Sequence, residues 1–339
     1  MRPGIIMDEK IKMAHGGGAA ASRRLIEQVF LKYFDNKILR GMDDSAELPP
    51  CKGRLAFTTD SYVASPVEFP GGNIGKLAVC GTVNDLSVKG ANPKWLSAAF
   101  ILEEGLETAL LERILAAMRD AANEAGVLIV TGDTKVVERG KADKIFITTA
   151  GVGEIPEGIN ISAANAKPGD AIIISGPLGA HGVALMNARH NLGIKSDIKT
   201  DSAPLNKLAA AAAQNGATVM RDITRGGLCA ALNEIADAAN VAIELDETLV
   251  PVEADVAAAC ALLGLDPLDI ANEGRLIAFV PQQKSAQTLA AMRAVRYGEK
   301  AVIAGTVVSS GKAVVELKTK AGGRRILRLP EGEQLPRIC

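Results

Sequence analysis

The chain has 339 residues, which is more than one ordinary hydrophobic core organises, and this length predicts two domains. Its composition, 48% hydrophobic and 23% charged, is that of a globular protein. The formal net charge of −1 excludes a global basic field for nucleic acid, and the sequence has no run of about 18 apolar residues that would span a membrane.

The five cysteines are scattered and never form a CxxC pair, and there are only three histidines. An odd number of cysteines without close spacing argues against a disulfide framework, and the histidines lack the spacing of a zinc site. The first residues are mixed apolar and charged and lack the apolar segment of a secretory signal. We therefore expect a protein of the reducing cytoplasm.

Residues 1–53 are a leader in which the glycine run Gly16-Gly17-Gly18 opens a predicted helix over 19–34. A first domain is predicted over 54–155, with helices over 74–89 and 107–125. Its strands are expected over 55–59, 95–102, 127–131 and 144–152. This alternation of strands and helices predicts α+β or α/β layering.

A stretch rich in turn residues, 156–170, leads into a second domain predicted over 165–328. Its helices are expected over 179–191, 203–214, 228–239 and 253–263, and its strands over 171–175, 217–220, 242–245, 276–280, 301–308 and 313–317. Residues 329–339 contain two prolines and a glycine without periodicity, which predicts an extended arm ending on Cys339. A thiol there could carry a chemical group between sites, or be an incidental surface cysteine.

The strongest internal pattern is an apolar strand that runs into an aspartate with small or hydroxyl neighbours. It recurs at Asp60, Asp133 and Asp222, and Asp85 lies on a segment apolar enough to be buried. Aspartates at strand ends project from one sheet edge, and converging carboxylates without histidine or thiolate suit Mg²⁺ bound to phosphate. A single such aspartate is more often a cap, but the set favours a metal–phosphate site.

Donors for phosphate are found beside glycines. The segment His15-Gly16-Gly17 leads into the predicted helix, where bare glycine amides can wrap a polyphosphate, although a flexible linker explains the run equally well. Residues 70–77 resemble a Walker A loop but fail it, because Pro70 replaces its first glycine and Leu77 its hydroxyl residue.

Cationic side chains accompany the acidic motifs. Thr131 and Lys135 flank Asp133, and Arg225-Gly226 follows Asp222 closely. A lysine or arginine in these positions could pair with the acids or clamp phosphates.

For two further residues, an ordinary structural role has to be weighed against a functional one. Glu273, between Asn272 and Gly274, is by itself most simply a turn residue before a strand. His181 is more often a polar residue at a helix start than a general base.

Together these segments resemble the hydrogenase-maturation carbamoyl dehydratases (HypE), a family of the PurM-like superfamily of aminoimidazole ribonucleotide synthetase, selenophosphate synthetase and thiamine-phosphate kinase. The similarity runs from residue 13 to the last residue, and the closing Pro336-Arg337-Ile338-Cys339 narrows the superfamily to the dehydratase. A serine is expected among the leader glycines of this family, and this chain has glycine there. The other segments that carry the resemblance are 14–18, 59–63, 69–75, 81–85, 131–137, 221–227 and 272–274.

The resemblance implies an α+β, PurM-like fold with two α+β domains, in which the N-terminal sheet pairs with that of a second subunit into a barrel across a homodimer. It implies ATP and Mg²⁺ near the dimer interface, with the leader over the phosphates. The implied metal ligands are Asp60, Asp85, Asp133 and Asp222. The implied cofactor-binding residues are His15, Gly16, Gly17, Asn84, Asp85, Thr131, Asp133, Arg225 and Gly226.

The resemblance also implies an activity. A partner carbamoyltransferase loads a carbamoyl group on Cys339, and the enzyme dehydrates it to a thiocyanate with ATP. The cyano group then passes to iron on a scaffold complex of maturation proteins and becomes a ligand of a [NiFe] centre. Our hypothesis is that Lys135 and Glu273 position the carboxamide and move its protons.

Two alternatives stay open at this point. The chain could phosphorylate another small amide or acid, with Cys339 incidental, or it could be a nucleotide-binding thiol carrier without turnover of its own.

Overall fold

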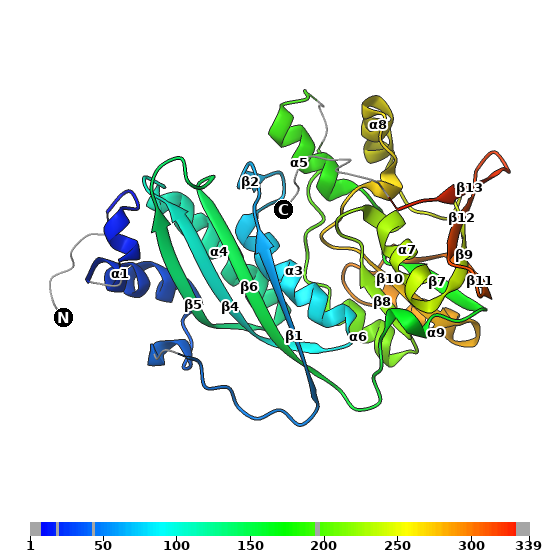
Figure 1. Cartoon of the computed structure of the whole chain (residues 1–339), viewed down its shortest axis with the longest axis horizontal. Helices are drawn as coiled ribbons and strands as arrows, with labels where there is room; N and C mark the ends of the chain where they lie inside the picture. Colours follow the sequence, from blue (N-terminus) through cyan, green and yellow to red (C-terminus); the bar gives the residue numbers. More distant parts are fainter. Residues whose placement is uncertain (1–7, 18–19, 43–44, 194–196, 330–339) are drawn as a thin grey trace.

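The computed structural model of the protein describes residues 8–17, 20–42, 45–193 and 197–329. Two sheets with their helices lie side by side, and the leader packs against the outer edge of the first (Figure 1). Within the described ranges, no helix has the length and apolar character needed to cross a membrane. The cysteines described there, Cys51, Cys80, Cys229 and Cys260, are free thiols.

The leader helix forms, but in pieces. A 3-10 turn, η1 (Met13–Gly16), is followed by α1 (Ala20–Leu25), a π-helical turn η2 (Ile26–Phe30) and α2 (Leu31–Phe34). A last 3-10 turn is η3 (Leu39–Gly41). The single helix expected over 19–34 is thus interrupted at its middle by a π turn, a feature that often marks functional sites.

The N-terminal sheet has the strand order β1 (Arg54–Tyr62), β6 (Ile145–Ile155), β4 (Asn92–Glu103), β5 (Leu128–Val137). Only the β4–β5 pair is parallel. A short hairpin, β2 (Glu68–Phe69) with β3 (Gly72–Asn73), leads into α3 (Ile74–Val88), which packs with α4 (Thr108–Ala125) on one face of the sheet.

Local sequence explains both of these helices. The Asn73 side chain caps α3 by accepting hydrogen bonds from the amides of Gly75 and Lys76. Helix α4 buries an apolar stripe that includes Leu111, and Gly126 ends it in the left-handed conformation.

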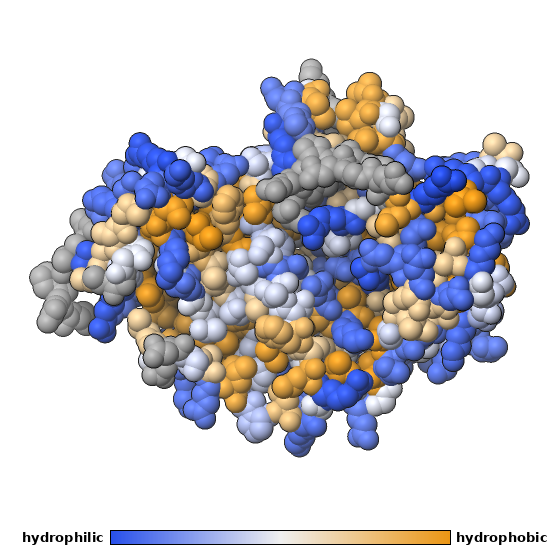
Figure 2. Space-filling view, viewed as in Figure 1, coloured by the Kyte–Doolittle hydropathy of each residue, from blue (hydrophilic) through white to orange (hydrophobic). Residues whose placement is uncertain are grey.

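The other face of the N-terminal sheet is uncovered and apolar. Leu55 and Phe57 on β1 are 61% and 71% exposed, and Ile101 on β4 and Leu128 on β5 are exposed as well. Apolar and weakly polar side chains cover these strands in the space-filling view (Figure 2). Exposed apolar side chains in such a group mark an interaction surface.

The C-terminal sheet has seven strands in the order β13-β12-β9-β11-β7-β10-β8. Strand β7 is buried on both faces, because Ile172 and Ile174 pack under α7 whereas Ile173 packs against α6 and α9. The strands are β7 (Asp170–Ile174), β8 (Val219–Asp222), β9 (Val241–Asp246), β10 (Leu276–Pro281), β11 (Val302–Ser310), β12 (Val314–Lys318) and β13 (Arg324–Leu327). The helices are η4 (Ala163–Asn165), α5 (Ala180–His190), α6 (Asn206–Gln214), α7 (Gly227–Ala239), α8 (Ala254–Leu263), η5 (Pro267–Asp269) and α9 (Gln282–Arg293).

The prediction that the motif aspartates end their strands is wrong for two of them. Strand β1 continues past Asp60, because residues 61 and 62 still pair with β6, and β5 continues past Asp133 in parallel pairing with β4. Asp222 does end β8, and Asp85 lies in the largely buried α3.

Candidate functional site

The leader closes over one edge of the N-terminal sheet and encloses a cavity of ≈ 500 Å³, the leader cavity. Six of the candidate cofactor-binding and catalytic residues line it: His15, Gly16, Gly17, Thr131, Asp133 and Lys135. Gly16 and Gly17 therefore face the same space as the Thr131–Lys135 motif, which lies more than one hundred positions away in the sequence.

Close backbone packing holds the leader on β5. A Cβ atom added at Gly16 would meet the backbone nitrogen of Val136 at 2.5 Å, so only glycine allows this approach. The buried His15 is fixed as well, because its Nδ1 accepts a hydrogen bond of 3.0 Å from the Lys12 amide. Burial lowers the pKa of His15, which favours a neutral ring beside the cavity.

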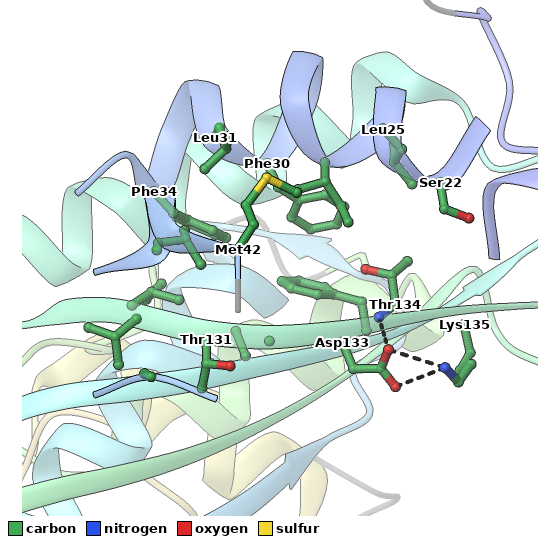
Figure 3. Close-up of a pocket in the computed structure, with 18 of the residues that line it drawn as sticks. Ser22, Leu25, Phe30, Leu31, Phe34, Met42, Thr131, Asp133, Thr134 and Lys135 are labelled. Carbon is green, nitrogen blue, oxygen red and sulfur yellow. Dashed lines mark hydrogen bonds and ion pairs between the residues drawn. The ribbon is translucent and has the colours of Figure 1, made fainter. Parts of the chain in front are cut away.

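The polar end of the leader cavity lies on β5. Lys135 Nζ is 3.1 Å from Asp133 Oδ2, and the Thr134 amide donates to Asp133 Oδ1 at 2.8 Å (Figure 3). Both members of the ion pair are more than half exposed. A solvated pair of this kind can exchange its partner for a phosphate or a cation at low cost.

The opposite end of the leader cavity is apolar. The rings of Phe30 and Phe100 lie 4.9 Å apart between their centroids, and Phe34 and Ile129 complete this wall. In Figure 3 the leader side chains point down toward the strand that carries Asp133. An apolar slot continuous with a charged, glycine-flanked end matches the two halves of a nucleotide.

A second group of candidates, the acid centre, consists of Asp60, Asp85, Asp222 and Glu273 at the junction of the two sheets. Asp85 Oδ2 accepts a hydrogen bond of 2.9 Å from Thr58, which precedes Asp60 by two residues on β1. The carboxylates act on one another electrostatically. The acid motifs of β1, α3 and β8 and the turn before β10 are thus brought together by the fold.

The environment of the acid centre disfavours its negative charges. Burial, followed by the charge of Asp60, raises the pKa of Asp85 to about 6. Burial and then the charge of Asp85 raise the pKa of Asp222 to about 7. The pKa of Glu273 lies well above its usual value, again through burial and then through Asp222. Crowded acids with raised pKa values are a place where a cation is favoured.

Arg225 and Gly226 border the acid centre. Arg225 is exposed, and its charge opposes the rise in the pKa of Glu273. Gly226 has a left-handed φ of 76° directly before α7, where the helix N-terminus adds favourable dipole for an anion.

Asp133 lies apart from the other three predicted metal ligands. One row across the sheet pairs Asp60 with Thr149, Thr149 with Ala98, and Ala98 with Gly132. Three strand spacings put β1 and β5 roughly 14 Å apart. In the part of the chain that is described, no three histidine, cysteine, aspartate or glutamate side chains are grouped to hold a metal ion.

Three predicted residues, Lys135, Glu273 and Asn84, have settings that sequence patterns did not indicate. Lys135 lines the leader cavity whereas Glu273 lies in the acid centre, so the chain does not bring this pair together. Asn84 connects the domains, because its Nδ2 donates to the carbonyls of Ala203 and Glu273 and its Oδ1 accepts from the Leu205 amide. Cys339 lies outside the described residues.

Sequence patterns missed residues that shape the acid centre. Tyr62 donates a hydrogen bond of 3.1 Å to Asp60, and Asp201 accepts one of 3.1 Å from the Glu273 amide. The run Thr200-Asp201-Ser202, an acid between hydroxyl residues, was the available signal for the second of these.

The fold, the leader cavity and the acid centre together define a class of protein. The N-terminal domain of AIR synthase related proteins matches residues 42–155, and the C-terminal domain matches residues 167–318. The chain is thus an AIR synthase related protein with both domains of that class, which confirms the two-domain PurM-like fold.

Close relatives narrow the class. The chain is 53% identical to carbamoyl dehydratase HypE of Rhodobacter capsulatus, covering 98% of this chain and 99% of that protein. A crystal structure of a hydrogenase maturation protein HypE in complex with ATP has a TM-score of 0.93 at 48% identity, covering 97% and 99%. A crystal structure of a HypE–HypF complex has a TM-score of 0.80 at 46% identity, covering 90% and 99%. The chain belongs to the HypE family of carbamoyl dehydratases, as its motifs predicted.

Proposed function

We propose that the protein uses ATP to dehydrate an S-carbamoyl group on its own Cys339 to a thiocyanate, which supplies the cyanide ligand of [NiFe]-hydrogenase iron. The observation that carries this proposal is the leader cavity, where Gly16 and Gly17 face the same space as the Thr131–Lys135 motif. A family relative that is 48% identical has been crystallised with ATP.

The nucleotide fits the leader cavity in one orientation. Its base lies in the apolar slot beside Phe30 and Phe34, and its phosphates lie toward the charged end near Lys135. The volume of ≈ 500 Å³ falls in the usual range of small-molecule sites. Exposed Lys135 then serves as a point charge for phosphate oxygens.

The chemistry of the acid centre suits Mg²⁺, and Asp60, Asp85 and Asp222 would hold it. Their carboxylates are crowded, and the pKa values of Asp85 and Asp222 are raised, so a cation relieves an existing electrostatic penalty. When bound, the ion neutralises charge on the transferred phosphate.

We further propose that a homodimer completes the site. Asp133 is separated from the acid centre by three strand spacings, and α3 and α4 cover the strands between them (Figure 1). The apolar sheet face with Leu55 and Phe57 supports pairing of two sheets into a barrel. Asp133 of one subunit then complements Asp60, Asp85 and Asp222 of the other.

The reaction needs activation of a poor leaving group. A carboxamide oxygen leaves as phosphate once it has received the γ-phosphoryl group, and the two N–H protons must be removed. Glu273, buried and with a raised pKa, is suited to proton transfer. Lys135 orients the phosphates.

Two partners follow from this reaction. A carbamoyltransferase must load Cys339, and the HypE–HypF complex of a 46% identical relative supports a partner of this kind. A scaffold complex that carries iron must accept the cyano group.

The decisive experiment is intact mass spectrometry of the protein carbamoylated at Cys339, before and after addition of ATP and Mg²⁺. We expect loss of one water, mapped to Cys339. Hydrolysis of ATP without that loss would favour another amide or acid as substrate, and absence of both would favour a thiol carrier. If Glu273→Gln and Lys135→Ala both left thiocyanate formation intact, their assigned roles would be wrong.

A further inference from the structure

A buried polar cluster contacts the turn that carries Glu273. It consists of His181 at the start of α5 and of Asp201 and Ser202 in the segment that precedes α6. His181 and Ser202 are 0% and 3% exposed, and the Asp201 side chain is 2% exposed. Polar groups buried to this degree normally have hydrogen-bond partners.

Three atoms of this cluster have none. His181 Nε2, Asp201 Oδ2 and Ser202 Oγ make no hydrogen bond to a nitrogen or oxygen atom of any residue that the structure describes, and the thiol of Cys80 is the neighbour of Ser202. Leaving such atoms unpaired costs stability, and several in one place indicate a bound polar group. Asp201 is the charged residue that acts on His181, so these atoms share one environment.

The remaining atoms of the cluster are firmly held. Asp201 Oδ1 accepts from the Glu273 amide at 3.1 Å, and the Ser202 amide donates to Thr200 Oγ1 at 3.0 Å. His181 Nδ1 lies 2.7 Å from the same Thr200 oxygen. The side chains are thus positioned in advance, with their unpaired atoms left over.

A positive charge accompanies the cluster without occupying it. Arg275 Nε is 3.6 Å from Asp201 Oδ2, but it donates its hydrogen bond to the Pro177 carbonyl at 2.8 Å. Arg275 Nη1 donates to the Gly274 carbonyl. The guanidinium therefore compensates the charge of Asp201 and leaves Oδ2 available to a ligand.

The unpaired atoms are mainly acceptors. Asp201 Oδ2 only accepts as a carboxylate, and Ser202 Oγ can accept. When His181 donates from Nδ1 to Thr200, its Nε2 presents a lone pair. A set of acceptors with this composition matches a group that carries two N–H hydrogens, such as a primary carboxamide.

We propose that His181, Asp201 and Ser202 form the nitrogen end of the dehydration site, where they accept the two N–H groups of the S-carbamoyl carboxamide. This inference rests on the proposed function and assigns it further substrate-binding residues. Glu273 links the cluster to the acid centre, because its amide donates to Asp201 Oδ1 and its carboxyl group is acted on by the charges of Asp222 and Asp60. The carboxamide oxygen then points back toward the phosphates.

The cluster and Glu273 together receive the two protons of the reaction. As the carboxamide oxygen attacks the γ-phosphorus of ATP, one N–H bond gives its proton to the Asp201 carboxylate and its electron pair to the C–N bond, and ADP leaves. The second N–H proton passes to the Glu273 carboxylate as the C–O bond breaks, and His181 Nε2 holds the nitrogen in place. The electron pair of that N–H bond completes the C≡N bond, and phosphate leaves with the oxygen.

The test measures single-turnover loss of water from the full-length protein carbamoylated at Cys339, at saturating ATP and Mg²⁺. We expect Asp201→Asn to lower the rate about 100-fold or more, because general acid–base groups typically contribute that much. Affinity for ATP should stay within about twofold. Asp170→Asn is the matched control, since Asp170 is also buried and accepts a backbone amide hydrogen bond, from Lys167. It should lose no rate.

A second readout does not depend on turnover. With a ¹⁵N-labelled carbamoyl group and no ATP, the two N–H resonances should be distinct and slow to exchange with water, and Ser202→Ala should alter them. If wild-type protein fails to lose water, the proposed function is wrong. If wild type reacts while Asp201→Asn keeps its rate and the N–H groups exchange freely, the cluster holds only a structural water and our inference is overturned.

Discussion

His181 should make stability depend on pH. Burial lowers its pKa from 6.5 to about 4, with only the charge of Asp201 opposing the effect. Between these values the unfolded chain binds a proton that the folded chain does not, so the free energy of unfolding falls as pH falls from 6.5 toward 4. From the two pKa values, we expect a loss of about 2 kcal/mol between pH 8 and pH 5.

Denaturant unfolding of wild type and His181→Gln at several pH values checks this. Other carboxylates titrate in both proteins, so the difference between them isolates the histidine. Parallel pH profiles would show that His181 does not carry the effect.

Residue types were easier to predict than their partners. The acids Asp60, Asp85 and Asp222 were singled out from local patterns, and the fold places them in one centre. Their neighbours come from tertiary structure, such as the Tyr62 hydroxyl on Asp60. Asp201 has only its hydroxyl neighbours as a local signal, and its contact with Glu273, more than seventy positions away, depends on the tertiary structure.

At the level of elements, we expect the docked leader to be disrupted by substitution of Gly16 but to tolerate substitution of Gly17. A methyl group at Gly16 would meet the Val136 nitrogen at 2.5 Å, whereas at Gly17 the nearest atom lies 3.7 Å away. We expect Gly16→Ala to displace the leader from β5 and to weaken ATP binding about tenfold or more, since overpacking typically costs 1–3 kcal/mol. Gly17→Ala should bind ATP normally.

Isothermal titration with ATP, together with hydrogen exchange of residues 8–34, measures both effects. Equal affinity in the two variants would mean that the docked leader does not form the nucleotide site.

Helices and strands were predictable where the buried positions are apolar and recur with the period of the element. They were missed where the buried positions are polar. Helix α4 shows its apolar stripe in the sequence, and it was expected within one residue of its bounds. Helix α9 was not expected, because the positions it buries include Ser285 and Thr288. Thr288 is accommodated there by hydrogen bonds to the carbonyls of Asn215 and Lys284, which no local pattern reveals.

For the whole molecule, the uncovered sheet face should mediate dimerisation. Phe57 is 71% exposed on this face, beside Leu55 on the edge strand β1. Phe57→Asp would place a charge in the paired barrel, and we expect it to give a monomer by light scattering at concentrations where wild type is a dimer. Leu262→Asp is the control, since Leu262 on α8 is 76% exposed in the other domain. A monomeric wild type would contradict the barrel.

If the two subunits of a dimer both contribute residues to each active site, variants of these residues should complement one another. Asp60 and Asp133 lie roughly 14 Å apart in one chain by their strand spacing, too far for one metal ion to contact both. If each site takes Asp60 from one subunit and Asp133 from the other, Asp60→Asn and Asp133→Asn homodimers should both be inactive. A mixed dimer would then contain one site with both aspartates and one with neither.

Mixing the two variants and allowing subunits to exchange should therefore restore activity to about one quarter of wild type, because half of the dimers are mixed and each has one intact site. The measurement is ATP-dependent water loss from carbamoylated Cys339. If both aspartates acted within one subunit, every site of the mixed dimer would lack one of them, and activity would stay at the level of the separate variants.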